Sequence, residues 1–476
     1  MRIGSLADGL LDSLETVANQ AGSWFEPTVR LGVTGLSGAG KTVFITALVA
    51  SLLRRGRMLE FEPETEGRVL AAMLSPQPDP SVPRFAYEAH LAALTARTPR
   101  WPSSTRTVSQ LRLSFRFRPS GYLGGLTGSG RLHLDIVDYP GEWLADLALI
   151  DTDYDSWAAE ALRTAEAPGR RAQAEPWLSA LAAADPAAPH DEPTAEALAK
   201  AYTGYLSACR KSGLAALSPG RFLLPGELEG SPALTFAPLP RPMNTARTTL
   251  YGEMRRRYDA YRRVVVKPFF QDHFAALDRQ VVLVDVLGAL AAGPRALGDL
   301  TDGMEATLAA FRHGASNWLD RILGARRIDR LLFVASKADH LHHQQHAALT
   351  HLVQAILAEA ADRAAFRGAE IRAMAIAAVR ATVEQEISRN GETLALVRGR
   401  RLDTGREVAV HPGTLPDDPR ALIAAARNPE NAENWPDAEF ARIPFAPPDW
   451  GPRLGDGPPH IRLDRALSFL IADKLD

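Results

Sequence analysis

The chain has 476 residues, of which 46% are hydrophobic, so it can bury a large core, and its length indicates two to three domains or one domain with large insertions. The net charge of −2 gives no reason to expect nucleic acid or an anionic membrane surface as a partner. A single cysteine, Cys209, excludes an intramolecular disulfide and favours a reducing, cytoplasmic setting.

At the N-terminus, residues 1–28 are expected to form an amphipathic helix. Between Leu6 and Phe25 the leucines recur at helical spacing, and the polar positions carry aspartates and a glutamate. Acidic side chains do not suit an anionic bilayer surface, so this helix is expected to pack on the body of the protein. The sequence shows neither an apolar run of transmembrane length nor a signal peptide.

The most informative segment, Gly35 to Thr42, has the pattern GxxxxGK[ST]. It follows an apolar stretch, residues 29–34, which is expected to be a strand, and precedes a stretch with helical character, which is the context of a phosphate-binding loop. Its glycines let backbone N–H groups converge on a phosphate, and the helix N-terminus adds partial positive charge. The alternative is an ordinary glycine-rich turn.

Two side chains of this loop have distinct expected roles. Lys41 should contact the β- and γ-phosphates, and the Thr42 hydroxyl should bind Mg²⁺. The loop therefore predicts a nucleoside triphosphate as ligand. The nucleotide-binding residues expected here are Gly35, Ser37, Gly38, Ala39, Gly40, Lys41, Thr42 and Val43.

Residues 55–107 are expected to interrupt the core with a helical stretch and a proline-containing linker. In nucleotide switches built on such a loop, a Mg²⁺-binding threonine would precede the next strand, residues 108–117. Thr107 lies closest to that strand, and Thr105 is the alternative. Both could also be ordinary loop threonines.

The strands 108–117 and 130–138 are expected to pair antiparallel through a glycine-rich turn. The second strand ends in Asp-Tyr-Pro-Gly, so it places a carboxylate at the sheet edge where nucleotides bind in open α/β folds. Asp138 should join the Mg²⁺ shell, and the Gly141 N–H should meet the γ-phosphate. The expected catalytic residues are Lys41, Thr42, Asp138 and Gly141, and the expected metal ligands are Thr42, Thr107 and Asp138.

The sequence specifies hydrolysis less well than binding. Many GTPases orient the attacking water with a glutamine after Asp-x-x-Gly, but this chain has Glu142 there. The γ-phosphate would repel this carboxylate unless it faces away, is protonated or contacts the metal. Turnover is expected to be slow unless a residue from an insertion or a partner completes the site.

Residues 142–279 are expected to form a mainly helical insertion. Within it, residues 168–193 resemble a surface loop or linker because they contain Pro, Gly and Asp, and residues 218–245 resemble an extended, proline-rich segment. A helix is expected over residues 251–277. Its arginines could contact an acidic partner or supply an arginine finger, or they could simply form a solvated face: Arg255, Arg256, Arg257, Arg262 and Arg263.

After the insertion, strands are expected at residues 280–286 and 329–335. Asp285 ends the first, where it could approach the magnesium or merely begin a turn. The second strand runs into Ser336, Lys337 and Asp339. The carboxylate can accept two hydrogen bonds from guanine, which adenine cannot donate, and the lysine stem can cover the base. The alternative is a carboxylate that caps the following helix.

A last core strand is expected at residues 371–376, and its exit could present the backbone at Ala378 and Val379 to the guanine O6. The histidines between these strands, His340, His342, His343 and His346, are expected on the solvated face of an exposed helix rather than around a metal. Residues 383–476 should contain a hairpin over residues 393–410 and a closing helix over residues 463–475.

The order of these segments predicts an α/β protein with a P-loop NTPase fold: a Ras-like GTPase core with a mostly parallel sheet, large helical insertions and a small C-terminal extension. The core is expected in two parts. The expected division is 1–28 for the N-terminal helix, 29–141 for the first part of the core, 142–279 for the helical insertion, 280–382 for the second part and 383–476 for the extension.

The chain resembles the YcjX-like family of bacterial P-loop proteins nearly end to end. The segments that carry this resemblance are RLGVTGLS (30–37), KTVFIT (41–46), DYPGEW (138–143), QVVLVD (280–285), SKAD (336–339) and PPHIRLDRA (458–466). The resemblance implies a cytoplasmic, stress-associated protein that binds guanine nucleotide, GTP or GDP, with Mg²⁺. It also leaves room for an unidentified protein partner, which could lie at the membrane, and the sequence gives no direct evidence for a nucleic acid partner.

Three functions fit these observations. The leading hypothesis is a slow, Mg²⁺-dependent GTPase that acts as a nucleotide-dependent switch in a bacterial stress response. The first alternative is an ATP- or GTP-dependent phosphotransferase whose helical insertion forms a lid. The second is a scaffold in which bound GDP is purely structural.

Overall fold

The computed structural model describes residues 26–35, 38–103, 107–120, 129–214, 217–313, 328–364, 369–389, 392–428, 435, 443–450 and 456–476. The expected N-terminal helix therefore lies, apart from residues 26–28, outside the described residues. Among those described, no helix combines the length and apolar character needed to cross a membrane.

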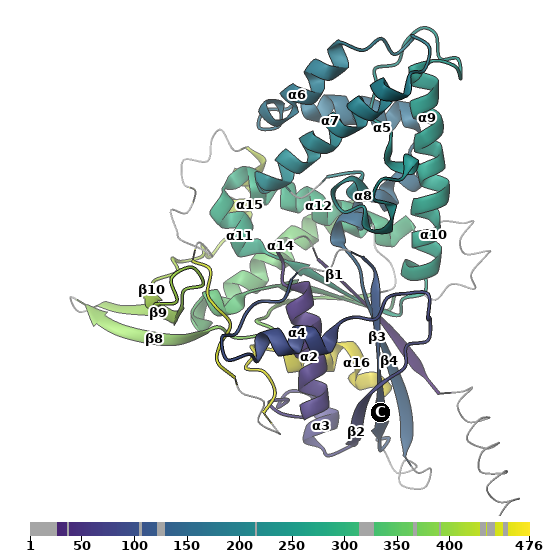
Figure 1. Cartoon of the computed structure of the whole chain (residues 1–476). Coiled ribbons are helices and arrows are strands. Elements are labelled where there is room, and N and C mark those ends of the chain that lie inside the picture. The colour runs from purple at the N-terminus through teal and green to yellow at the C-terminus, as the bar shows by residue number, and fades with distance from the viewer. Residues whose placement is uncertain are drawn as a thin grey trace, which may run out of the picture.

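A seven-stranded sheet forms the centre of the molecule, in the order β2-β3-β4-β1-β5-β6-β7 (Figure 1). Strands β4, β1, β5, β6 and β7 are parallel, whereas β3 runs antiparallel to β4 and β2 runs antiparallel to β3. The strand bounds are β1 Thr28–Gly35, β2 Val69–Ser75, β3 Ser109–Phe117, β4 Gly130–Asp138, β5 Arg279–Val284, β6 Arg330–Ala335 and β7 Glu370–Ala375. This is the predicted α/β class with a mostly parallel sheet.

The burial of each strand follows its place in the sheet. In β3, buried and less buried side chains alternate, because the strand covers a core with only one face. All six residues of β5 are buried, and β6 is nearly as buried, because both faces of these central strands are covered. The six strands expected from the sequence are confirmed to within two residues at each end. Strand β2 was missed: its Ala-, Leu- and Met-rich sequence favours a helix, and only pairing with β3 makes it a strand.

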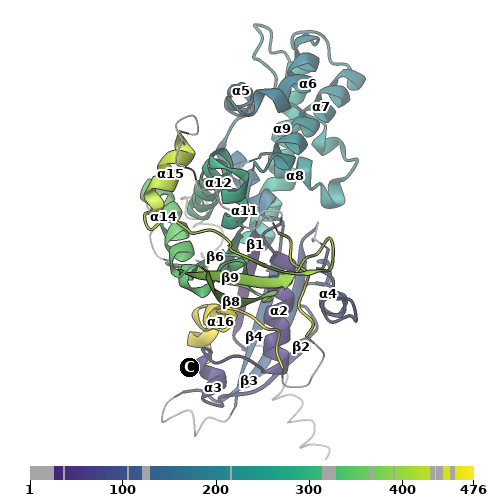
Figure 2. The same ribbon diagram turned by 90° about the vertical axis from the view of Figure 1, so that its left-hand side faces the viewer.

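The sheet separates two hydrophobic cores. On β6, Leu332 and Val334 belong to one core and Leu331 and Phe333 to the other, because neighbouring side chains point to opposite faces. The first core is closed by α2 (Lys41–Arg54), α4 (Tyr87–Leu94) and α16 (Leu463–Ile471). A short helix, α3 (Glu62–Thr65), follows α2 in the chain. The second is closed by α11 (Val286–Ala292), α12 (Pro294–His313), α14 (His346–Ala364) and α15 (Pro419–Arg427). Figure 2 shows α2 and α14 on opposite sides of the sheet.

The second core continues into a helical insertion above the carboxyl ends of the strands (Figure 1). The insertion begins with a 3-10 helix, η1 (Gly141–Asp151), directly after β4. Its helices are α5 (Tyr154–Ala165), α6 (Arg171–Ala182), α7 (Glu192–Lys211), α8 (Gly220–Leu223), α9 (Leu250–Tyr261) and α10 (Lys267–Phe269), and π-helical turns flank α10 at residues 262–266 and 270–274. Aromatic rings fill its interior, as in the stacked pair of Trp157 and Tyr258, 4.8 Å apart.

Two details of the insertion differ from expectation. The sequence predicted a loop or linker at residues 168–193, but α6 forms there, because Trp177 is fully buried and stacks on Tyr205 of α7 at 5.3 Å. Burial of that ring outweighs the local Pro and Gly signals. The expected helix over residues 251–277 is present but changes its winding after Tyr261. Residues 218–245 form an extended path with only short helical turns.

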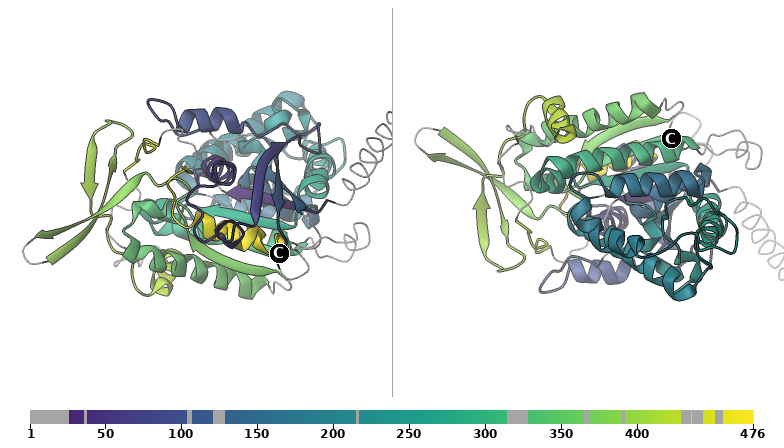
Figure 3. Two further views of the ribbon diagram at one scale, coloured as in Figure 1. Left: turned by 90° about the horizontal axis from the view of Figure 1, so that it is seen from below. Right: turned by 90° about the horizontal axis from the view of Figure 1, so that it is seen from above.

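A separate three-stranded sheet, in the order β10-β9-β8, projects from the body (Figure 3). Its strands are β8 (Thr382–Arg389), β9 (Glu392–Arg400) and β10 (Glu407–Val410). The hairpin expected over residues 393–410 is confirmed as the β9–β10 pair. Strand β8 was missed, because TVEQEISR carries polar and charged residues in place of a strongly apolar alternation.

Candidate nucleotide-binding site

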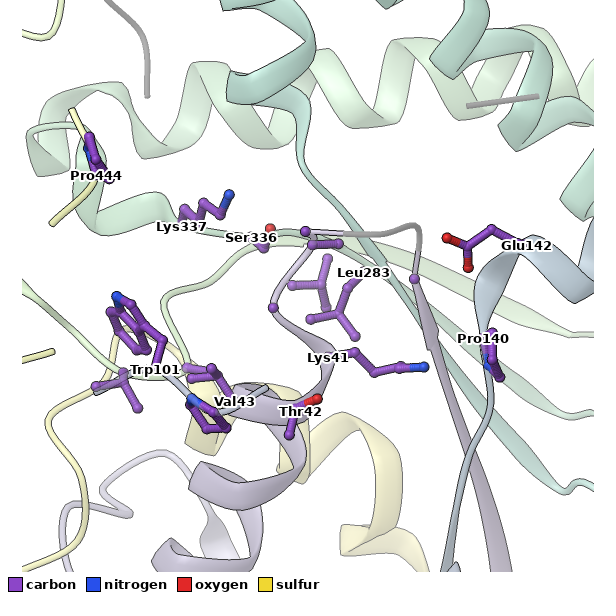
Figure 4. A pocket seen from close by; sticks show the side chains of 18 of the residues that line it. Lys41, Thr42, Val43, Trp101, Pro140, Glu142, Leu283, Ser336, Lys337 and Pro444 are labelled. Carbon is purple, nitrogen blue, oxygen red and sulfur yellow. The ribbon is translucent and has the colours of Figure 1, made fainter. Parts of the chain in front are cut away.

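A cavity of about 1030 Å³ lies at the carboxyl ends of the parallel strands, which is where open α/β folds bind ligands. The phosphate loop, the loop after β4, the loop after β6 and the insertion all contribute to its wall (Figure 4). The expected site residues that line it are Gly35, Gly38, Ala39, Gly40, Lys41, Thr42, Val43, Thr107, Ser336, Lys337, Asp339, Ala378 and Val379. The structure thus brings together segments more than 300 residues apart.

Four expected residues stand apart from this set. Asp138 and Gly141 do not line the cavity, although both are buried next to residues that do. Ser37 and the alternative switch threonine, Thr105, lie outside the described residues.

The phosphate loop has the backbone that its sequence predicts. Gly38 and Gly40 have φ angles of +86° and +84°, a region that favours glycine, and an added Cβ would meet nothing within 4 Å at either position. Gly35 has a different requirement, because a Cβ there would lie 2.8 Å from the Leu283 carbonyl oxygen. Helix α2 begins at Lys41, so its N-terminus, with its free N–H groups, faces the cavity.

Lys41 and Asp138 form an ion pair below the phosphate loop. The Lys41 Nζ lies 3.0 Å from Asp138 Oδ1 and donates to the Tyr139 carbonyl at 2.8 Å. Asp138 is fully buried, and neither of its carboxylate oxygens accepts a hydrogen bond from the described residues. A buried carboxylate with unused acceptor capacity fits a hard cation such as Mg²⁺.

At the other end of the cavity, the loop after β6 carries the residues expected to read the base. Lys337 has a left-handed backbone, with φ +60°, and its ammonium forms an ion pair with Asp285. Asp285 in turn accepts from the Gly288 N–H at 2.9 Å and caps α11. Asp285 therefore begins a helix and positions the lysine.

Asp339 is buried, with 4% of its surface exposed, inside a 3-10 turn over Ala338–His340. Its Oδ2 accepts from the Ala381 N–H at 2.8 Å, and its backbone carbonyl accepts from the Thr382 hydroxyl. The alternative of a helix-capping carboxylate is therefore wrong: α14 begins only at His346, and the Asp339 side chain bonds across to the segment before β8. Oδ1 accepts no hydrogen bond from the described residues.

The walls at this end come from parts of the chain that sequence reasoning did not connect with the site. Trp101, from the insertion before β3, donates through its indole N–H to the Phe445 carbonyl at 2.8 Å, and both residues line the cavity. The His340 ring packs edge-on against Phe445 at 5.2 Å. Figure 4 shows Trp101, Lys337 and Pro444 toward one end of the cavity and Glu142 toward the other. No local motif marks these aromatic and proline residues.

A later part of the insertion, around Gly220, contacts the start of η1 at the phosphate end of the cavity. Glu142 is 6% exposed, and its Oε1 has no hydrogen-bond partner among the described residues. Gly220 packs so tightly on it that an added Cβ would lie 2.0 Å from the Glu142 carbonyl oxygen. One residue farther along each segment, the guanidinium of Arg221 stacks 3.2 Å from the centre of the Trp143 ring.

Asp146 stabilises this contact through hydrogen bonds. Its carboxylate accepts from the Gly220 N–H and from the Tyr261 hydroxyl, both at 2.6 Å. Burial raises the pKa of Asp146 to about 6, although the bonds from Tyr261 and Gly220 act in the opposite direction. Segments from three parts of the insertion therefore meet at one carboxylate.

The arginine cluster expected on the helix at residues 251–277 lies elsewhere, because none of its five members lines the cavity. Arg256 and Arg257 pair with Glu253 at 2.6 and 2.7 Å, and Arg262 pairs with Asp259 at 3.2 Å. The arginine that does line the cavity is Arg210, in the last turn of α7. It is partly buried, and among the described residues its side chain has no hydrogen bond or ion pair.

Known proteins match this chain over almost its full length. The model of the YcjX-like family, DUF463, matches residues 29–475. A protein named Ras-like GTPase YcjX from Escherichia coli K12 is 40% identical over 461 residues, which cover 94% of this chain and 96% of the relative. A protein of the same name from Shewanella oneidensis MR-1 is 36% identical over 502 residues, which cover 98% of this chain and all of the relative.

Proposed function

Because this chain belongs to the YcjX-like family and has a Ras-like P-loop GTPase core, we propose that it binds a guanine nucleotide with Mg²⁺ and hydrolyses GTP slowly. The observation that carries the proposal is the single cavity that joins the phosphate loop to Asp339. A nucleotide in it would have its phosphates on Gly38–Thr42 and its base beside Lys337 and Asp339. Residues 29–141 and 280–382 would form the nucleotide-binding core.

The residues at the phosphate end suit a magnesium nucleotide. The Thr42 and Thr107 hydroxyls and the Asp138 carboxylate would hold Mg²⁺, and the Gly141 N–H would contact the γ-phosphate. Bound Mg²⁺ would offset negative charge on the β- and γ-phosphates. Since Lys41 pairs with Asp138 in the structure, phosphate binding would draw the ammonium toward the nucleotide and leave the carboxylate to the metal.

For hydrolysis, we propose that Arg210 completes the site from the insertion. Arg210 lines the nucleotide cavity, and its side chain has no partner among the described residues, so its guanidinium can pair with the charge that develops on the transferred phosphoryl group. It would also reduce the repulsion between the γ-phosphate and Glu142. The sequence offered such a role in cis as one of three alternatives for the arginines of residues 255–263, beside contact with an acidic partner and a solvated face.

At the base end, specificity for guanine follows from the hydrogen bonds that Asp339 can accept. Oδ1 has no donor among the described residues, and Ala381 N–H holds the carboxylate in place through Oδ2. Guanine presents two donors that satisfy the carboxylate, whereas adenine would leave it without a partner in a buried position. The backbone at Ala378 and Val379 lines the same end of the cavity.

We further propose that nucleotide state controls the contact between the insertion and an unidentified protein partner, since η1 follows the Gly141 switch position directly. A cytoplasmic role in a bacterial stress response is part of this proposal. It is supported by the family resemblance and by the need for a pool of guanine nucleotide.

Calorimetric titration tests the binding proposal. GDP, GTP-γ-S and ATP-γ-S should be titrated with Mg²⁺ into nucleotide-free wild type, Asp339→Asn and, as a matched control, Asp417→Asn, which changes an exposed carboxylate outside the cavity. We expect guanine binding in the wild type and control, loss of about 10³-fold or more in Asp339→Asn, and recovered binding of xanthine nucleotide. Equal binding of ATP-γ-S that does not depend on Asp339 would refute guanine specificity and favour the alternative of an ATP-dependent phosphotransferase.

A further inference from the structure

The sequence predicted that the four histidines after Asp339 lie on a solvated helix face, but only His343 is exposed. His346 is 2% exposed, and its Nε2 donates to the Ala338 carbonyl at 2.8 Å, so it has a structural role. His340 lines the nucleotide cavity. His342 and His343 instead face strand β8 of the second sheet, next to Glu384. The fold of the C-terminal extension over this loop explains the difference.

Two glutamates of β8 complete this group. Glu384 and Glu386 are two positions apart on the strand, so they share one face of it. His342 Nε2 lies 3.8 Å from Glu384 Oε2 and 3.8 Å from Glu386 Oε1, and His343 Nδ1 lies 2.6 Å from Glu384 Oε2. The ligand atoms of His342, His343 and Glu384 all lie within 4.8 Å of one another, and Glu386 approaches this group on the His342 side.

The burial of the His342 ring is not explained by direct hydrogen bonds. Its side chain is 2% exposed, and neither ring nitrogen makes a hydrogen bond to the described residues. At 3.8 Å, Nε2 is too far from either carboxylate for a hydrogen bond. Ligand atoms about 2.1 Å from a shared tetrahedral ion are roughly 3.4 Å apart, so both distances suit a common metal better than they suit direct contact.

We propose that His342, His343 and Glu384, with Glu386 beside His342 as a fourth ligand, form a binding site for a transition-metal ion such as Zn²⁺, separate from the nucleotide's Mg²⁺ site. Imidazole and carboxylate ligands suit Zn²⁺, and two carboxylates balance the charge of a divalent ion between neutral histidines. The hydrogen bond from His343 to Glu384 gives way to coordination of both groups. The other oxygen of Glu384 lies 3.4 Å from the Arg380 guanidinium, which would hold the carboxylate in orientation.

The site would connect metal binding to the base end of the nucleotide cavity. Its histidines follow Asp339 by three and four residues, and its glutamates follow Ala381, whose N–H bonds the Asp339 side chain. Thr382, which begins β8, donates to the Asp339 carbonyl. An ion between the loop and β8 would therefore hold both sides of this contact in one arrangement.

Zinc binding by the full-length protein tests the proposal. Chelator-treated, nucleotide-free protein should be titrated with Zn²⁺ in competition with a fluorescent chelator, and Co²⁺ should be added separately to record its visible absorption. The variants are His342→Ala, His343→Ala and Glu384→Gln, with His351→Ala as a control on the exposed surface of α14. His343 is 61% exposed, so its variant should fold even if His342→Ala does not.

We expect one Zn²⁺ per chain in the wild type and in His351→Ala, and affinity at least tenfold weaker in His343→Ala and Glu384→Gln. Co²⁺ should give the intense visible absorption of a tetrahedral site in the first two proteins only. Absence of Zn²⁺ binding in the wild type, or wild-type affinity in the folded His343→Ala and Glu384→Gln variants, would overturn the assignment. Neither result depends on whether the protein binds guanine nucleotide.

Discussion

Replacement of Asp146 by Asn should change how stability depends on pH. The carboxylate is buried, and its pKa rises from 3.8 to about 6 on folding, so the folded state binds the proton more tightly than the unfolded state. The stability that this proton contributes is fully present below pH 3.8 and is lost as the pH rises through 6. Asparagine keeps the shape of the side chain but cannot ionise.

The size of the effect follows from the two pKa values. The full shift is worth about 3 kcal/mol at 1.36 kcal/mol per unit, and roughly 2 kcal/mol of it falls between pH 4.5 and pH 7. The free energy of unfolding of Asp146→Asn, relative to wild type, should therefore rise by roughly 2 kcal/mol over this interval. The offset at any one pH also contains the altered bonds to Gly220 and Tyr261, so the slope is the informative quantity.

Urea unfolding followed by tryptophan fluorescence at pH 4.5, 5.5, 6.2 and 7 measures this slope, because Trp143, Trp157 and Trp177 all lie in the insertion core. Asp417→Asn, at an exposed position, should run parallel to the wild type at every pH. Parallel curves for Asp146→Asn and wild type would refute the reasoning, and so would a difference that falls as the pH rises.

Two further changes test the contact between the insertion and the nucleotide site. Arg210→Ala should lower the kcat for GTP hydrolysis by about 10³-fold and leave GDP affinity within about threefold. Arg255→Ala, which lies outside the cavity, is the control and should leave both quantities unchanged. An unaltered kcat in Arg210→Ala would exclude the proposed role. Gly220→Ala should lower stability by about 1–3 kcal/mol in thermal unfolding, because its Cβ would lie 2.0 Å from the Glu142 carbonyl oxygen. Gly204→Ala, in the middle of α7 with open space around it, serves as the control and should be neutral or slightly stabilising; equal melting temperatures for the two variants would contradict the predicted clash.

The sequence predicted most of the sheet and both ends of the candidate site because their signals are local. A glycine-rich loop between an apolar strand and a helix can adopt few backbone paths, and Gly38 and Gly40 have the positive φ angles that such a loop needs. Asp138 and Asp339 each end or follow a strand with a strong apolar pattern, so their place at the sheet edge follows from the strand itself.

The parts that sequence reasoning missed depend on contacts between distant segments. Arg210 resembles any other arginine near a helix end, and only the fold of α7 over the sheet edge brings it to the cavity. His342 is buried and lies beside β8, a strand with few apolar residues that the sequence did not predict. The Pro and Gly residues before α6 favoured a loop, yet burial of Trp177 decided the helix.

The second hydrophobic core has a consequence for how the molecule unfolds. Phe333 of the central sheet and Trp157 of the insertion belong to the same continuous cluster, so separating the two parts would expose apolar surface on both. The insertion and this face of the sheet therefore behave as one cooperative unit rather than as a domain and an appendage. A ligand bound at the strand ends stabilises everything that unfolds with them, so nucleotide occupancy should protect helices of the insertion that the nucleotide never touches.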